Sequence, residues 1–235
     1  MDYCGVAVAG PQVQLCVLRE VREPEPPIRL EATFYEPGNA DQVALQIHTL
    51  GDAVVAIAAP AGPARGGRER RVCDVELEAR GVPPAPASEP GARLFQALTD
   101  LDVFAPDGED LEGLVTEGVY SHAAVFETNA DGVFCALQER RVPARRHPLG
   151  VQRRIEELIG DHVTDPGGDL WHRRIEEIEA AAAALCAHRY AVGHARWIGD
   201  PAEGVVVLPG SGPIQRFPTD GVLPPVVRTP LPETG

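Results

Sequence analysis

A run of apolar residues, Ala53 to Ala59, constrains this chain more than any other feature of its sequence. The run reads AVVAIAA and ends at Pro60. A short, continuous apolar run of this kind is typical of a β-strand that is buried on both faces. We therefore expect an α/β fold in which helices cover both faces of a sheet.

Three segments that read as β-strands precede this run. Residues 3–9 are apolar and β-branched, and residues 13–21 and 28–35 alternate between apolar and polar side chains. Short turns separate the three segments, so we expect them to pair as antiparallel neighbours. A helix that begins at Asn39 and closes at Gly51 leads from them to the apolar run.

The rest of the chain alternates helical and strand-like segments. We expect helices at 68–80, 130–137, 149–159 and 170–190, strands at 123–127 and 205–208, a Pro-rich spacer at 81–91, and short helices with irregular structure at 92–120. The simplest organisation is one α/β domain over residues 1–209, followed by a Pro/Gly-rich tail at 210–235.

The composition excludes several chemistries. All 21 basic residues are Arg, which excludes a P-loop, a Schiff-base enzyme and a protein kinase, because each needs a Lys. The three serines, Ser88, Ser121 and Ser211, do not lie in a G-x-S-x-G elbow. The formal net charge of −14 disfavours non-specific binding to duplex DNA over the whole surface, but it allows a local basic groove.

The cysteines and the two ends of the sequence indicate in which cellular compartment we expect the protein. Five widely spaced Cys residues without a C-x-x-C pair predict reduced, buried thiols and a cytoplasmic protein. No signal peptide is expected, because the first residues lack a basic start and an apolar run, and no stretch is long enough to span a membrane. The terminal string Leu231 to Gly235 (LPETG) matches a sorting signal without its apolar segment, so an appended tag or a chance match is the better interpretation.

Six short strings are spread in order over residues 3–209. They are Gly5 to Gly10 (GVAVAG), Val54 to Gly62 (VVAIAAPAG), Arg71-x-Cys73-Asp74-x-Glu76, Phe126-Glu127, Glu176 to Ala180 (EEIEA), and Gly199 to Pro209 with its Gly-Asp-Pro turn. Together they resemble the predicted-nuclease family known as domain of unknown function 429. The resemblance implies a ribonuclease-H-like fold: a five-stranded mixed sheet in the order 3-2-1-4-5 with helices on both faces.

In ribonuclease-H-like nucleases, carboxylates from the first strand, a neighbouring strand and a late helix hold two Mg²⁺ or Mn²⁺ ions. The resemblance places family Asp residues at positions 7 and 58, where this chain has Ala7 and Ala58. A methyl group cannot ligate a metal. The resemblance therefore implies that metal-dependent phosphodiester hydrolysis is weakened or lost.

Three acids remain as candidate catalytic residues by the same resemblance: Glu127, Glu176 and Glu179, with Glu127 and Glu179 as metal ligands. Glu176 and Glu179 are three residues apart, so they share one face of a helix. The alternative for Glu127 is an ion pair or a solvated strand end, and for the other two a charged helix stripe. Asp74 is expected to favour a helix N-terminus.

Two groups of arginines are candidate phosphate ligands. They follow the expected strands at 53–59 and 123–127, where a site in an α/β sheet opens, and Arg binds phosphate with two parallel hydrogen bonds. The alternative is a solvated face that balances nearby acids. The candidates are Arg65, Arg68, Arg71, Arg145 and Arg146.

Three functions remain open from the sequence. The first is a metal-dependent nuclease with nucleic acid or another phosphodiester as its substrate. The second is a non-catalytic relative that binds nucleic acid, a nucleotide or a protein through its arginines. The third is a different small-molecule enzyme on the same scaffold.

Overall fold

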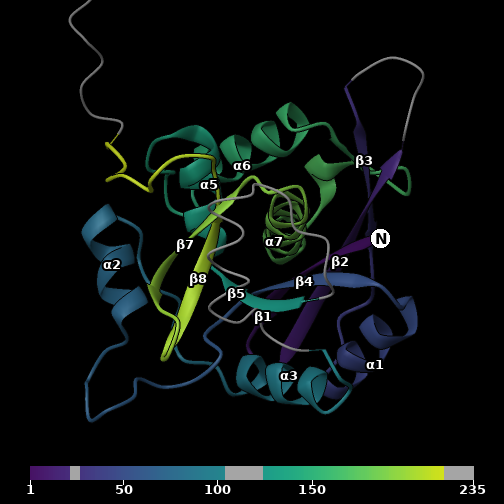
Figure 1. Ribbon diagram of the computed structural model, residues 1–235. Coiled ribbons are helices and arrows are strands. Elements are labelled where there is room, and N and C mark those ends of the chain that lie inside the picture. The colour runs from purple at the N-terminus through teal and green to yellow at the C-terminus, as the bar shows by residue number, and fades with distance from the viewer. Residues whose placement is uncertain (22–26, 104–123, 220–235) are drawn as a thin grey trace, which may run out of the picture.

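The computed structural model describes residues 1–21, 27–103 and 124–219. An eight-stranded sheet forms its centre, in the order β6-β3-β2-β1-β4-β5-β8-β7. Helices α1 and α3 cover one face, and α5, α6 and α7 cover the other (Figure 1). The architecture is therefore mixed α/β with helices on both faces, as predicted.

The first half of the chain builds the predicted core of the sheet. Strands β1 (Asp2–Ala9), β2 (Gln12–Val21) and β3 (Arg29–Phe34) pair antiparallel, and β4 (Ala53–Ala58) lies parallel to β1 after helix α1 (Ala40–Leu50). The neighbour of β4 is β5 (Ala124–Thr128), again parallel. The predicted strand order 3-2-1-4-5 is confirmed within the larger sheet.

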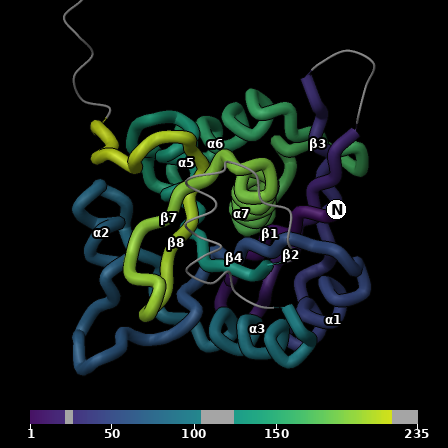
Figure 2. Tube along the Cα trace, in the orientation of Figure 1, coloured from purple at the N-terminus to yellow at the C-terminus, as the bar shows by residue number. Residues whose placement is uncertain are grey.

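The second half adds the remaining elements (Figure 2). They are α2 (Val72–Arg80), α3 (Glu89–Thr99), α5 (Ala130–Gln138), α6 (Pro148–Gly160), β6 (Val163–Thr164), the 3₁₀ turn η1 (Leu170–His172), α7 (Ile175–Ala191), β7 (Ala195–Asp200) and β8 (Gly204–Pro209).

The expectation of five strands was wrong, because the sheet has eight. Strand β6 is a two-residue strand beside β3, too short to leave a periodic pattern. Strand β7 carries Arg196, Gly199 and Asp200 in a segment without apolar alternation, and its pairing with β8 holds it in the sheet.

Two predicted helices begin later than expected. Arg71 and Arg174, the N-cap residues of α2 and α7, both have extended backbone, so neither helix includes the preceding arginines. The helix predicted at 170–190 is divided into η1 and α7. Of the ambiguous segment 92–120, residues up to Thr99 belong to α3, and residues 104–120 lie outside the described part of the chain.

Helix α7 packs directly on β1. It is buried on nearly all sides, and the alanines from Ala180 to Ala184 are fully buried between the sheet and the outer helices. A Cβ atom at Gly5 of β1 would lie 1.9 Å from the backbone nitrogen of Ala184 and 2.1 Å from the carbonyl oxygen of Ala180. Only glycine on the strand and small residues on the helix allow this approach.

Residues 210–219 come directly after β8 and contact the domain through backbone hydrogen bonds. The Phe217 amide donates to the carbonyl of Arg80 (3.0 Å), and the Arg141 amide donates to the carbonyl of Pro218 (2.9 Å). The Phe217 side chain is buried against the core. The domain boundary at residue 209 stays a prediction, and the described start of the tail packs on the domain.

All five cysteines are free and buried. Within the described ranges, none of the helices combines the length and the apolar character that crossing a membrane requires. A cytoplasmic location stays a prediction.

Replacing Gly5 tests the contact between α7 and β1. We expect G5A to lower the free energy of unfolding by about 3 kcal/mol or more, because the new methyl group overlaps helix backbone that cannot rotate away. Urea denaturation measures the change. G62A is the control, because a Cβ there meets nothing within 4 Å, and its effect should stay within about 0.5 kcal/mol. A G5A protein as stable as G62A would contradict the packing described.

Candidate functional site

Ala7 and Ala58 lie side by side at the carboxyl ends of β1 and β4. They are paired in the parallel register of the two strands, so their side chains point to the same face of the sheet. That face packs against α7, because both alanines belong to the core on that side. Ala7 is almost fully buried. The two positions therefore meet in space as the resemblance implies, but they offer only methyl groups.

A buried amide on the adjacent strand lies beside Ala7 and binds an arginine. Gln14 of β2 is the register partner of Ala7, it is 2 % exposed, and its Oε1 accepts a hydrogen bond from Nη2 of Arg174 (3.0 Å). The other side of the Arg174 guanidinium donates from Nε to Glu177 (3.2 Å). Two buried polar groups therefore hold Arg174, and one of them, Gln14, neighbours Ala7.

Glu177 also belongs to a wider ion-pair network. Its second carboxylate oxygen accepts from Arg173 Nη1 (3.1 Å), and Arg173 forms a two-hydrogen-bond pair with the buried carboxylate of Asp165 (2.8 and 3.1 Å). The Arg173 guanidinium lies over the ring of Phe34, with its Cζ atom 4.3 Å from the ring centroid. Arg173 is fixed by these contacts, and Glu177 links it to Arg174.

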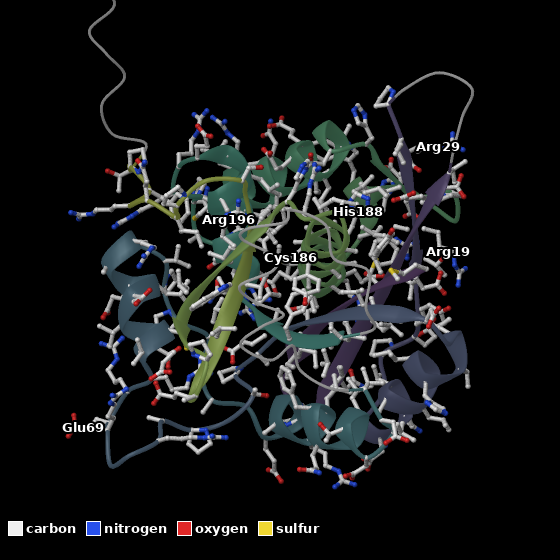
Figure 3. All side chains as sticks on the ribbon, in the orientation of Figure 1. Arg19, Arg29, Glu69, Cys186, His188 and Arg196 are labelled. Atoms are coloured by element: carbon white, nitrogen blue, oxygen red, sulfur yellow. The ribbon has the colours of Figure 1, made fainter. Side chains whose placement is uncertain are left out.

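Glu127 points away from the two alanines. It is paired in register with Ile57, whose side chain lies on the face toward α1 and α3. The next residue, Thr128, faces α7, where its Oγ1 lies 3.5 Å from Sγ of Cys186. Cys186 is labelled on this helix in Figure 3. Alternation along β5 therefore separates Glu127 from the side of the sheet that carries Ala7 and Ala58.

An arginine neutralises Glu127. Arg71 donates to both of its carboxylate oxygens (2.6 and 2.7 Å) and also forms two hydrogen bonds to Asp74 (2.6 and 2.9 Å). The Ala61 amide donates to Glu127 as well (2.9 Å). Burial raises the pKa of the Glu127 carboxyl, and the bonds from Arg71 and Ala61 counteract that shift. Asp74 is therefore an ion-pair partner of Arg71 as well as a residue in the first turn of a helix.

Cys73, Asp74 and Glu127 form a group that could hold a metal ion by distance alone, because one ligand atom from each lies within 4.8 Å of the others. Mg²⁺ and Mn²⁺ do not fit this group. The Arg71 guanidinium is hydrogen-bonded to the carboxylates of both Asp74 and Glu127. Burial raises the pKa of the Cys73 thiol to about 12, so the thiol stays protonated and is a poor metal ligand.

Glu176 and Glu179 meet at a different arginine. Nη2 of Arg145 donates to Glu179 (2.7 Å) and lies 3.5 Å from Glu176. Burial raises the pKa of Glu179 to about 7, while the charge of Arg145 lowers it in part. The predicted helix face is present, and the two carboxylates share the Arg145 guanidinium.

The remaining candidate arginines differ in their surroundings. The backbone amide of Arg65 donates to Glu203 (3.0 Å), and Arg68 lies 3.7 Å from the same carboxylate. Arg146 is exposed and forms no ion pair with the residues that the structure describes. Catalytic, metal-binding and phosphate-binding roles for the predicted site residues stay predictions.

A hollow of about 330 Å³ opens at the same edge of the sheet. Val8, Ala58 and Ala59 come from the strand ends, and residues 85–90 before and within the first turn of α3 form the opposite wall. The lining is mainly apolar, with the side chains of Ser88 and Glu89 as its polar exceptions. Ligand sites in open α/β sheets lie outside the carboxyl ends of strands, where this hollow lies.

Sequence reasoning missed Gln14, Arg173, Arg174 and Glu177 as site residues. One signal could have found Gln14. Gln14 is a polar residue in a stretch of β2 that is buried on both faces, so its side-chain amide needs a buried polar partner.

No protein-family model and no curated protein matches the chain. Among solved structures, the chain is similar to "Thermus thermophilus RuvC structure", with a TM-score of 0.38, 12 % identity, and coverage of 82 % of this chain and 96 % of that chain. A likeness at this level carries no functional argument, and membership of the resembled family is not confirmed.

The pair of Arg71 and Glu127 can be tested by removing one partner. We expect R71L to lower the free energy of unfolding by about 3–5 kcal/mol, because it leaves a buried carboxylate without its cation. Chemical denaturation near pH 7 measures the loss, which the double variant R71L/E127L should largely recover. R93L is the matched control, since the pair of Arg93 and Asp41 is exposed and its loss should cost less than about 1 kcal/mol. Equal effects of R71L and R93L would contradict the account.

The raised pKa of Glu179 predicts that the stability of the folded protein depends on pH. The folded protein keeps the Glu179 proton up to about pH 7, whereas the unfolded chain releases it near pH 4.5. Between these values the unfolded state binds fewer protons, so stability falls as pH rises, by about 3 kcal/mol in total. Denaturation at pH 5 and pH 8 should show a smaller loss for E179Q than for the natural protein. The exposed control D41N should behave like the natural protein. An unchanged loss in E179Q would contradict this assignment.

Proposed function

We propose that this chain is a ribonuclease-H-like protein that has lost two-metal phosphodiester hydrolysis and acts by binding a ligand. The strand order supports the fold part of the proposal. Three antiparallel strands followed by parallel β4 and β5, in the order 3-2-1-4-5, with α7 across β1, is the arrangement that the sequence resemblance implies.

The observation that carries the loss of hydrolysis is the pairing of Ala7 with Ala58. These positions lie in register at the carboxyl ends of the two central strands, where metal-ligating carboxylates would face α7. Mg²⁺ and Mn²⁺ require oxygen ligands, which two methyl groups do not provide.

The neighbouring acids support the same conclusion. Glu127 is held by Arg71, Glu179 by Arg145, and Glu177 by Arg173 and Arg174. Each of these carboxylates already has a cationic partner at hydrogen-bond distance. A divalent ion would have to displace a guanidinium before it could bind.

Binding remains as the role for such a scaffold. Nucleic acid or a nucleotide is the favoured partner class, because Arg146 is exposed without an ion pair among the described residues, and Arg68 is 54 % exposed. A protein partner is the alternative. With a net charge of −14, contact with nucleic acid is confined to local arginines.

Metal titration and nuclease assays test the loss of hydrolysis. Calorimetry with Mg²⁺ or Mn²⁺ should show no binding heat at millimolar ion, and neither single-stranded nor structured DNA and RNA should be cleaved above a no-protein control. Tight binding of two Mn²⁺ ions with metal-dependent cleavage by the natural sequence would refute the proposal.

Restoring the carboxylates is the complementary test. We expect A7D/A58D to gain Mn²⁺-dependent thermal stabilisation, because two adjacent carboxylates then face the same side of the sheet. The matched control A7N/A58N has the same shape without the charge and should gain little. Failure of the Asp pair to bind metal, in a protein that folds by circular dichroism, would show that these positions are not the lost ligand sites.

A further inference from the structure

We propose that the segment that leads into α7, Trp171 to Arg174, binds single-stranded nucleic acid, with bases stacked on its exposed side chains and a phosphate held by Arg174. This inference rests on the proposed function and narrows its ligand class to a single strand. The observation behind it is that the segment exposes three side chains, and each is of a type that stacks on bases.

Trp171 is exposed on a rigid turn. It is 49 % exposed, and its indole forms no hydrogen bond or ring contact with the residues that the structure describes. The backbone beneath it is fixed, because Asp169 Oδ1 accepts from the Trp171 amide (3.0 Å) and the buried side chain of Leu170 anchors the turn. A single exposed apolar side chain carries no functional argument, so the neighbours of Trp171 decide its role.

His172 and Arg174 are exposed on either side of an inward-facing arginine. Arg173 and Arg174 both have extended backbone, so consecutive side chains alternate in direction. The Arg173 guanidinium lies over the ring of Phe34 and is bonded to buried Asp165, which directs it toward the domain. The side chains of His172 and Arg174 therefore point outward, and they are 85 % and 58 % exposed.

Arg174 is the phosphate ligand of this segment. Gln14 accepts from its Nη2 (3.0 Å) and Glu177 accepts from its Nε (3.2 Å), so the plane of the guanidinium is fixed while most of the side chain stays exposed. Its Nη1 group donates to no residue that the structure describes. A guanidinium held in this way can donate to phosphate oxygens or stack on a base.

The spacing within the segment suits consecutive nucleotides of one strand. Trp171 and Arg174 are three residues apart, so their Cα atoms are separated by at most about 11 Å. A base stacked on Trp171 therefore has a phosphate of its own or a neighbouring nucleotide within reach of Arg174. Arg145 extends this surface, because its guanidinium lies 3.5 Å from Glu176 in the first turn of α7. Several nucleotides fit this arrangement better than a mononucleotide does.

The charges around the segment favour stacking over a strong electrostatic attraction. The carboxylates of Asp165 and Glu177 are bonded to arginines, whereas Asp169 is 52 % exposed and repels a phosphate at the other end of the segment. We therefore expect modest affinity and a shallow dependence on salt. A duplex hides its base faces, and the net charge of −14 disfavours its phosphates, so a single strand is the favoured ligand.

Binding of single-stranded DNA and RNA of about 12 nucleotides, within the lengths that such surfaces cover, tests the proposal. The full chain is titrated in EDTA, so divalent ions do not contribute. We expect saturable binding to the natural protein, a loss of about tenfold or more in W171A, and partial recovery in W171F, because Phe also stacks on bases. The matched control V75A removes an equally exposed apolar side chain on α2 and should bind like the natural protein.

Two further measurements separate stacking from the phosphate contact. W197F leaves Trp171 as the only tryptophan, since the chain has two, and the oligonucleotide should quench its fluorescence. R174Q should make the slope of log affinity against log salt less steep by about 0.7, the value for one phosphate contact on a single strand. R93Q, an exposed arginine paired with Asp41, should leave the slope unchanged. Circular dichroism checks that each variant is folded.

The proposal is overturned if neither oligonucleotide binds at high micromolar concentration, if a duplex binds as tightly as the single strand, or if W171A binds as tightly as V75A does. Metal-dependent cleavage by the natural protein would instead refute the proposed function, and the measurements in EDTA distinguish the two failures.

Discussion

The direct contact between α7 and β1 determines the rest of this structure. Gly5 allows the helix backbone to rest on the strand, and the alanines from Ala180 to Ala184 keep the two elements close. This contact fixes which part of α7 lies over the carboxyl end of β1. There Arg174 donates to Gln14 and to Glu177, and Gln14 is the register partner of Ala7 on the adjacent strand.

Arginine is the cationic partner of three buried carboxylates, two of which are the predicted metal ligands Glu127 and Glu179. Arg71 holds Glu127, Arg145 holds Glu179, and Arg174 holds Glu177. Each guanidinium compensates the charge of its carboxylate when that carboxylate is ionised, and no ion from solution is required.

The sequence predicts the centre of the fold well, because the apolar run at 53–59 and the three strands before it have clear patterns. The family resemblance implies that positions 7 and 58 meet, and the parallel register of β1 and β4 pairs Ala7 with Ala58. The sequence does not predict that Glu127 faces away from them, because that depends on the register between β4 and β5. The ion pairs are equally hidden: Arg71 and Glu127 are 56 positions apart, and Gln14 and Arg174 are 160 apart.

Diffraction from crystals equilibrated with Mn²⁺ tests the central claim most directly, because the anomalous signal locates the ions without an activity assay. The account predicts no paired ion peaks beside residues 7 and 58, and electron density for the Arg174 guanidinium on Gln14. Two peaks about 4 Å apart next to these alanines, with Arg174 displaced, would contradict it.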